Sequence, residues 1–391
     1  MIILWIVLGV IGLPLLALGL YFLKAIVQGA LEGWRGADAG SGEDGSEEDG
    51  SEEDADQPYE LPAAAAALGM LPPEEQNRDS AAPVPAVLAS AVAAAERGDW
   101  QPAADLLAAT AAGRDWENRS FHSWWLADMA ADDDTWLLAW ESARPDDPGA
   151  ALVRARSTVA LAGKIRGAKQ AKYTTAEQFA GFRRVMEQSR EHHARAAELA
   201  VEGDPVPYIG RISTALGLGD PHIEMERIWK EITERDPNHY EAHYMALQYW
   251  CAKWRGSEKL ARDFAAEAAE KAPPGSLMTV FPLIAHFEHD ESDTTDADRT
   301  PRMRALVDAL LADVTAADPA HPRLAEARHM LAYYLSLQDR DEAAVEQFRL
   351  VDGYVDALPW RYRGDPAAAY CRMRDLSLGN LNGGGGEGVS G

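Results

Sequence analysis

Four histidines fall in two pairs whose spacing could support metal chemistry. His239 and His243 lie four residues apart and His286 and His289 three apart, so each pair shares one face if its segment is helical. Imidazole nitrogens on two neighbouring helices can bind Zn²⁺, and the four would then form a divalent-metal site or a metal-dependent hydrolase. The first pair lacks the H-E-x-x-H arrangement, because Glu241 stands at the wrong offset for a base beside the metal. Packing and helix capping are the favoured roles for these histidines, and the metal site is the alternative.

The two cysteines and the glycine-rich segments predict no catalytic centre. Cys251 and Cys371 are far apart in sequence, and neither has a metal-type spacing around it. Cys251 lies beside Trp250 and Trp254 in an apolar segment, which favours a buried thiol over a nucleophile. The sequence has no phosphate-binding loop, no serine-hydrolase elbow and no dinucleotide-binding loop. We therefore expect neither an enzyme nor a bound cofactor.

Positive charge is concentrated in residues 154–195. This stretch holds ten Lys and Arg against three Glu, whereas the whole chain has a net charge of −26. It is either a solvated helical face or a surface that binds anionic lipid, an acidic partner segment or the acidic residues 43–56 of the same chain. The acidic balance argues against nucleic acid as a partner. The candidate partner-binding cations are Lys164, Arg166, Lys169, Lys172, Arg183 and Arg184.

Five tryptophans are crowded into residues 116–140. Large aromatic side chains usually fill helix–helix interfaces, and they also act as anchors in protein–protein interfaces. Periodicity alone does not decide which of the five faces a binding surface. Trp124 and Trp140 are the two candidates for partner contacts.

The segments that must position these residues have helical period, and Asp-Pro dipeptides separate them. Each dipeptide marks a helix boundary, because proline does not fit a helix interior. No run of alternating β-branched residues suggests a strand. Thr174 and Glu177 predict a capping box at the start of a long helix. The dipeptides begin at residues 147, 204, 220, 236, 318 and 365.

Two local patterns predict pairs of closely packed helices. In residues 98–107 a small residue is followed four positions later by a bulky one, Ala103 and then Leu107, as in the turn of a tetratricopeptide repeat. Residues 331–348 repeat this pattern with Ala344 and Phe348. The predicted fold is therefore all-α, an irregular tetratricopeptide-like helical-repeat solenoid over residues 83–375.

Residues 114–288 resemble a family of bacterial tetratricopeptide-like proteins that carry a domain of unknown function. The resemblance is carried by R-D-W-x-x-R-S-F at residues 114–121, by A-R-P-D-D-P at residues 143–148, and by residues 243–257 with their A-L-Q-Y, K-W and G-S elements. It implies a helical-repeat fold. The family brings no established activity, substrate or catalytic residue.

The N-terminal residues 1–24 predict a single transmembrane helix. Residues 1–23 hold no charged side chain, and a helix of that length spans about 34 Å, which is enough for a hydrocarbon core of about 30 Å. Lys24 and Arg35 follow the span, so the positive-inside rule places the following domain in the cytoplasm. A cleaved secretory signal is the alternative, but no basic residue precedes the apolar run and the run is long for a signal.

Two further segments are predicted to lack packed structure. Residues 25–82 are rich in Gly, Ser, Ala and acidic residues and predict a disordered acidic linker. Residues 376–391 end in a glycine run and predict a flexible tail. Taken together, the sequence predicts a single-pass protein of the cell membrane. Its helical domain would act as an adaptor that binds a peptide or protein partner in a repeat groove.

Overall fold

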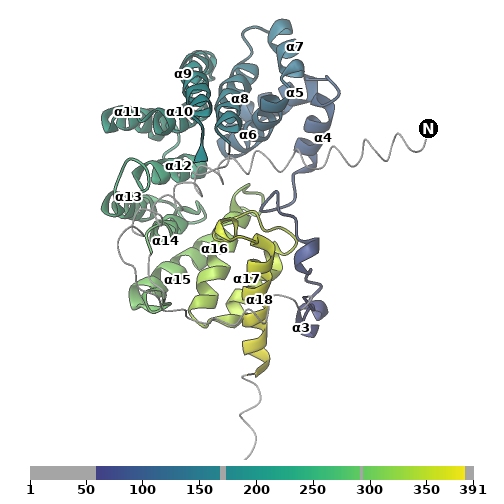
Figure 1. The fold of residues 1–391 in the computed structure, drawn as a ribbon, viewed down its shortest axis with the longest axis vertical. Helices are drawn as coiled ribbons and strands as arrows, with labels where there is room; N and C mark the ends of the chain where they lie inside the picture. The colour runs from purple at the N-terminus through teal and green to yellow at the C-terminus, as the bar shows by residue number, and fades with distance from the viewer. Residues whose placement is uncertain (1–58, 168–172, 291–293, 384–391) are drawn as a thin grey trace, which may run out of the picture.

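The described chain consists of helices joined by connections of varied length (Figure 1). The computed structural model describes residues 59–167, 173–290 and 294–383. Within these ranges the only β-type pairing outside the helices is one isolated bridge between Asn77 and Tyr354. The prediction of an all-α fold is confirmed. The α-helices are α3 (Ala63–Ala67), α4 (Ala86–Ala95), α5 (Gln101–Ala112), α6 (Trp116–Asp132), α7 (Thr135–Ala143), α8 (Pro148–Arg166), α9 (Ala176–Leu199), α10 (Val206–Leu218), α11 (His222–Thr233), α12 (Tyr240–Trp250), α13 (Glu258–Lys271), α14 (Phe281–Phe287), α15 (Pro301–Ala316), α16 (Leu324–Leu337), α17 (Asp341–Val351) and α18 (Pro366–Gly383).

All six Asp-Pro dipeptides lie at helix boundaries, as predicted. Asp147 caps α8 by accepting hydrogen bonds from Gly149 N and Ala150 N, and Pro148 occupies the first helical position. Proline is tolerated there because its missing N–H would have no partner within the helix. Asp365 caps α18 in the same way. The aspartate supplies the cap and the proline blocks extension of the helix toward its N-terminus.

The capping box of the long helix α9 lies one residue beyond its predicted position. Thr175 accepts a hydrogen bond from Gln178 N, and Gln178 Oε1 accepts one from Thr175 N. The prediction of Thr174 with Glu177 was therefore wrong. Gln fills the same role as Glu, because its carbonyl oxygen reaches back to the same N–H.

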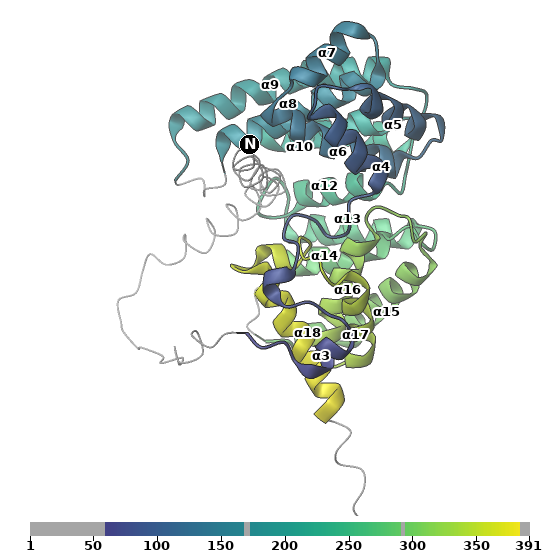
Figure 2. The ribbon, with the colours of Figure 1, turned by 90° about the vertical axis from the view of Figure 1, so that its right-hand side faces the viewer.

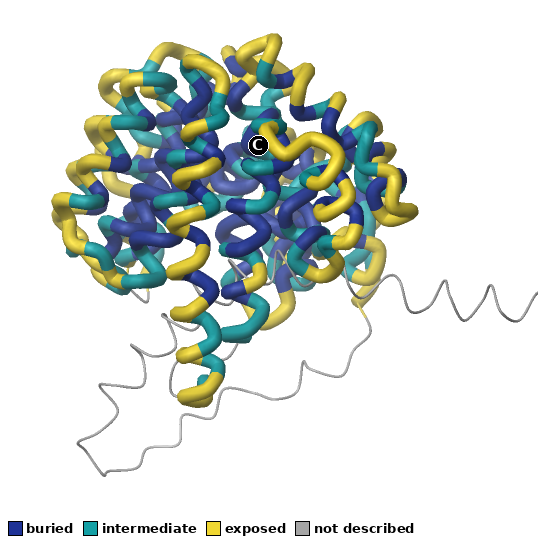
Figure 3. The backbone as a smooth tube through the Cα atoms, turned by 90° about the horizontal axis from the view of Figure 1, so that it is seen from above, coloured by how far each residue is buried: buried dark blue, intermediate teal, exposed yellow. Residues whose placement is uncertain are grey.

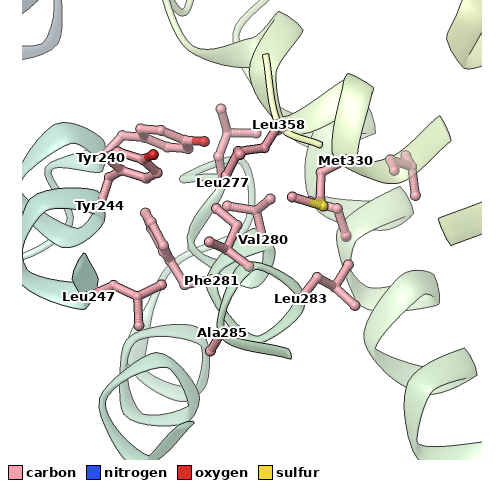
Figure 4. Packing of buried hydrophobic residues seen from close by; sticks show 14 of the residues in the cluster. Tyr240, Tyr244, Leu247, Leu277, Val280, Phe281, Leu283, Ala285, Met330 and Leu358 are labelled. Carbon is pink, nitrogen blue, oxygen red and sulfur yellow. The ribbon is translucent and has the colours of Figure 1, made fainter. Parts of the chain in front are cut away.

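Helices that are neighbours in sequence pack against each other and form two large hydrophobic clusters and a third, minor one of Ala162, Val185 and Met186 between α8 and α9. Of the two large clusters, the smaller cluster lies among α4–α8 and contains Trp136, Trp140 and Leu126. The larger one extends from α10 to α18, and Figure 4 shows its centre around Phe281. Figure 3 shows buried stretches gathered inside the molecule and exposed turns at its periphery. We call α4–α11 the N-terminal half and α12–α18 the C-terminal half; they occupy the upper and lower parts of Figure 1. The larger cluster spans both halves, because α10 and α11 contribute Ile212 and Ile228 to it.

Residues 59–85 form a segment that we call the strap. It lies along α17 and α18 and then leads into α4, as Figure 2 shows for the purple segment around α3. Its backbone is bonded to the C-terminal half: Leu71 N donates to Asp352, and Asp356 N donates to Ser80 O. The prediction of a disordered linker was therefore wrong for residues 59–82. Composition does not reveal these bonds, because their partners lie about 280 residues later in the chain.

Two other predictions concern the chain ends. Helix α18 continues to Gly383, so the predicted tail was wrong for residues 376–383, where Leu378 is buried and Ser377 bonds Ser336. The predicted transmembrane segment, residues 1–24, lies outside the described residues, as does the linker up to residue 58. None of the helices in the described ranges is both long and apolar enough to cross a bilayer.

Candidate binding groove

A groove with a volume of about 630 Å³ lies where the two halves face each other. Its N-terminal wall comes from α6, α8, α9 and α10, and its C-terminal wall from α12, residues 322–326 and residues 356–361. The strap contributes residues 80–82 to the lining. A cavity of this size is within the range of sites that bind ligands.

One face of α6 supplies the aromatic wall. Phe121, Trp124 and Trp125 line the groove and are half-buried, whereas Leu126 and Ala130 on the opposite face are buried in the smaller cluster. Side chains three and four positions apart share one side of a helix, which explains this division. The rings of Trp124 and Trp125 meet edge-on with centroids 5.7 Å apart. Phe179 and Phe182 of α9 add to the same apolar lining.

The floor of the groove is a buried network of charges, which we call the floor network. Arg156 of α8 pairs with Glu241 of α12, and Arg323 lies 3.5 Å from the other oxygen of that carboxylate. Arg323 also pairs with Glu326 at 2.7 Å. Arg156 belongs to the N-terminal half, and Glu241, Arg323 and Glu326 belong to the C-terminal half. The floor network therefore joins the two halves. A buried charge is tolerable because every member has a partner of opposite sign.

Hydroxyl groups complete the floor network. Ser120 Oγ donates to Glu241 at 2.6 Å, and Arg156 donates to Ser120 Oγ and Ser123 Oγ. Burial opposes ionisation of Glu241, but the nearby Arg156 and Arg323 guanidinium groups outweigh it and hold the pKa of this carboxyl at about 2. Glu241 is therefore a carboxylate at neutral pH and carries no proton for acid catalysis.

A second buried pair lies beside the strap. Asp356 is 2% exposed, and Arg361 Nε lies 3.4 Å from one of its carboxylate oxygens. Arg361 also donates to the backbone oxygen of Asp356 at 2.6 Å. Both residues line the groove. The carboxylate and the guanidinium balance each other here as in the floor network.

The predicted basic surface is divided by the fold. Lys164 pairs with Asp128 and Asp132 and is only 10% exposed, so its charge is already neutralised within the N-terminal half. Arg166 and Arg183 line the groove, and Arg184 is exposed beside it in sequence. The other candidates, Lys169 and Lys172, lie outside the described residues. Outside the candidate set, Arg154, Arg156, Arg190 and Arg195 of the same stretch also have acidic partners.

The two candidate tryptophans have different positions. Trp124 lines the groove, whereas Trp140 is fully buried between Trp100 and Trp136. The placement of Trp140 on a binding surface was therefore wrong. It fills the core because α7 packs against α6 and α8 and turns this face toward the smaller cluster.

The four candidate histidines do not come together as metal ligands. His239 is the N-cap of α12 and accepts from Ala242 N, and the His243 ring packs against Trp229 and Phe281. His289 has its two ring nitrogens engaged by backbone groups. The favoured roles of packing and capping are confirmed for His239 and His243. Burial lowers the pKa of His243 to about 4, as expected for an imidazole in an apolar cluster.

Among the described residues, a different group has the spacing of a metal site. His286 lies near Asp290 and Asp298, and their ligand atoms are within 4.8 Å of one another. His286 Nε2 is 2.9 Å from Asp298, so this pair is also satisfied by a hydrogen bond without any ion. The two thiols are poor nucleophiles, since burial raises the pKa of Cys251 well above its usual value and that of Cys371 to about 12.

Sequence reasoning did not identify the members of the floor network. Glu241 was considered only as a misplaced catalytic base, and Arg323 was not considered. One usable signal was present in the sequence: Glu241 lies in a mostly apolar run, residues 240–250, which the structure shows to be a helix buried on nearly all sides. A carboxylate in such a segment needs a buried cation.

The fold and the site define an all-helical protein with an aromatic-walled groove above a paired ionic floor. Comparisons with protein-family models, with curated proteins and with solved structures found no match to this chain. The function is therefore inferred from the groove itself.

Proposed function

We propose that this protein is a membrane-tethered adaptor whose groove binds a peptide or helical segment of a protein partner. The observation that carries the proposal is the row of half-buried aromatic side chains on α6, Phe121, Trp124 and Trp125, which line a groove of about 630 Å³. Aromatic side chains in a partly desolvated groove are the residue types that dominate binding energy in protein interfaces.

The ionic floor supports binding rather than catalysis. Its carboxylates and guanidinium groups are committed to one another, and Arg156 is buried and bonded to Ser120, Ser123 and Glu241. Such groups hold the two walls at a fixed separation. A preformed groove lowers the entropic cost of binding, because few side chains must be ordered when the partner arrives.

The helical-repeat interpretation and the resemblance to tetratricopeptide-like proteins belong to the same proposal. Helices that are neighbours in sequence pack side by side, which is the arrangement from which repeat proteins build their concave surfaces. In this interpretation the membrane anchor, residues 1–24, concentrates the adaptor and its partner at the cell membrane.

A selection from a random-peptide display library on the full chain in detergent tests the groove. Enriched peptides are then measured against Trp124→Ala, with Leu138→Ala as the control, because Leu138 is 53% exposed on α7 and does not line the groove. We expect Trp124→Ala to weaken binding about 30-fold or more and Leu138→Ala to leave it unchanged. Equal binding by both variants would refute a peptide-binding groove.

Reporter fusions test the proposed tether. A fluorescent cytoplasmic reporter at the C-terminus should be active and an alkaline phosphatase fusion inactive, because Lys24 and Arg35 favour a cytoplasmic C-terminal side. Recovery of the untagged chain in the soluble fraction, or phosphatase activity at the C-terminus, would contradict this part of the proposal.

A further inference from the structure

The charges that line the groove do not all have partners. In the floor network Arg156 and Arg323 face Glu241 and Glu326, and at the strap Arg361 faces Asp356. Asp128 on α6 is matched by Lys164. Two groove-lining cations are left over, Arg166 and Arg183, which form no ion pair with any residue that the structure describes. We call these two residues the rim arginines.

Arg166 is half-buried, so its lack of an acidic partner is costly. Its side chain donates one hydrogen bond, to Gly167 O at 3.3 Å. It lies in the last turn of α8, where the helix dipole favours a cation, and this offsets only part of the cost. Burial lowers the pKa of Arg166, which reflects a charged form without full compensation. A carboxylate of a ligand in the groove would supply the acidic partner that Arg166 lacks among the described residues.

Arg183 has no helix terminus to compensate it, because it lies within α9. Phe179 precedes it by four residues and Phe182 by one, and all three line the groove. Gln178, near the start of α9, donates to the backbone oxygen of Arg166 at 3.1 Å. The rim arginines therefore lie on adjoining parts of α8 and α9, next to the apolar lining.

We propose that the occupant of the groove is a protein segment that combines apolar anchor side chains with one or two carboxylates. Its apolar side chains pack against Phe121, Trp124 and Phe182, and its carboxylates bind the rim arginines. A guanidinium group can bind a carboxylate through two parallel hydrogen bonds, which fixes the position of the acid relative to the anchors. This inference rests on the proposed peptide-binding function and specifies its ligand.

Two other anionic ligands fit less well. The acidic residues 43–56 of the same chain carry carboxylates but no large apolar side chain, so they match the rim arginines and not the aromatic wall. A membrane surface needs a broad exposed patch of cations, and Lys164, Arg154 and Arg190 are already paired with acids. A partner segment that supplies both features satisfies the whole groove.

The same display selection, carried out in parallel on three forms of the full chain, tests this ligand class. They are the natural protein, Arg183→Glu, and Arg184→Glu as the matched control on the same helix. We expect the natural protein and the control to enrich peptides with Asp or Glu near aromatic or aliphatic residues. For one such peptide, Arg183→Glu should weaken binding at least about 10-fold, and replacing the acid of the peptide by Lys should restore it.

The outcomes separate this inference from the proposed function. If the enriched peptides lose binding in Trp124→Ala but carry no excess of acid, or bind Arg183→Glu as well as the natural protein, the inference is wrong and the groove proposal stands. If they are insensitive to Trp124→Ala, both are wrong. A synthetic peptide of residues 43–56 is tested as a competitor for the groove. If it displaces a selected peptide as well as the selected peptides displace one another, apolar anchor side chains are not required and the inference is wrong. Equal loss of binding to phosphatidylserine vesicles by both charge variants would assign the charges to a lipid surface.

Discussion

The floor network and the rim arginines use the same side chain in opposite ways. Arg156 in the floor is 6% exposed and bonded to Ser120, Ser123 and Glu241. Arg183 at the rim is exposed and has no acidic partner among the described residues. The first holds two halves of the fold together, and the second contributes nothing that the fold needs. A charged residue in a groove is therefore informative about function only after its partners have been counted.

The largest expected effect is on the floor network. Arg156→Gln should lower the free energy of unfolding by about 3–5 kcal/mol, because it leaves Glu241 buried with only the more distant Arg323. Urea unfolding followed by circular dichroism measures the change. Arg184→Gln on the exposed side of α9 is the control and should change stability by less than about 0.5 kcal/mol. A loss below about 1 kcal/mol in Arg156→Gln would show that the two halves do not depend on this network.

The next effect is a dependence on pH that does not come from the floor. The pKa of His193 is lowered to about 3 by burial and by Arg156 and Arg211, and the pKa of His329 to about 3 by burial and by Arg361. The unfolded chain binds these protons below about pH 6.5 and the folded chain does not, so stability falls as the pH drops through 6.5. His243, whose pKa burial lowers to about 4, contributes in the same way, and the three histidines together give a loss of up to about 4 kcal/mol for one unit of pH.

Urea unfolding at pH 7.5, 6.5 and 5.5 checks this loss, with His329→Gln as the diagnostic variant. Gln keeps an acceptor for Trp360 Nε1, which now donates to His329 at 3.1 Å, and it does not titrate. Because His193 and His243 still titrate only in the unfolded chain, the slope of stability against pH should be lower than that of the natural protein by up to about a third. Glu241, whose pKa is about 2, contributes to this dependence only below about pH 4.5, where the unfolded carboxyl begins to take up a proton. An onset of the loss near pH 4.5 instead would assign it to the floor.

The strap gives a third, smaller effect. Asp352 accepts hydrogen bonds from Leu71 N, Gln76 and Tyr370 and pairs with the fully buried Arg374. Asp352→Ala should lower the free energy of unfolding by about 2 kcal/mol, and less than the full loss of an ion pair because Arg374 keeps Asp375. Limited proteolysis should then cut residues 59–79 before the rest of the domain. A variant whose strap resists protease as well as the natural chain does would contradict this role.

The sequence could predict features that depend on neighbouring residues, but not those that depend on contacts between distant residues. Helix boundaries followed from Asp-Pro pairs, because capping and proline geometry are set by residues that are neighbours in the chain. The packing of His243 and the burial of Cys251 followed from local apolar surroundings. Arg156 and Glu241 are 85 residues apart, and Leu71 and Asp352 are 281 apart, so the floor and the strap depend on the tertiary fold. For the same reason, the sequence did not show that Lys164 is paired with Asp128 and Asp132, or that the strap is bonded to the C-terminal half.

The smallest expected effect on stability is at the rim, and it is the most direct test of the comparison. Arg183→Gln removes a charge and keeps a residue of nearly equal helix propensity, so neither α9 nor its packing should change. Arg183 is exposed and has no ion pair with the described residues, so the free energy of unfolding should shift by less than about 0.5 kcal/mol. The same substitution at Arg156 has the largest effect of the series, although both residues line one groove. Affinity for an acidic peptide selected on the natural protein should nevertheless fall at least about 10-fold in Arg183→Gln. A destabilisation above about 1 kcal/mol would show that Arg183 has an intramolecular partner and belongs with the floor, and the division between structural and ligand-binding arginines would then be wrong.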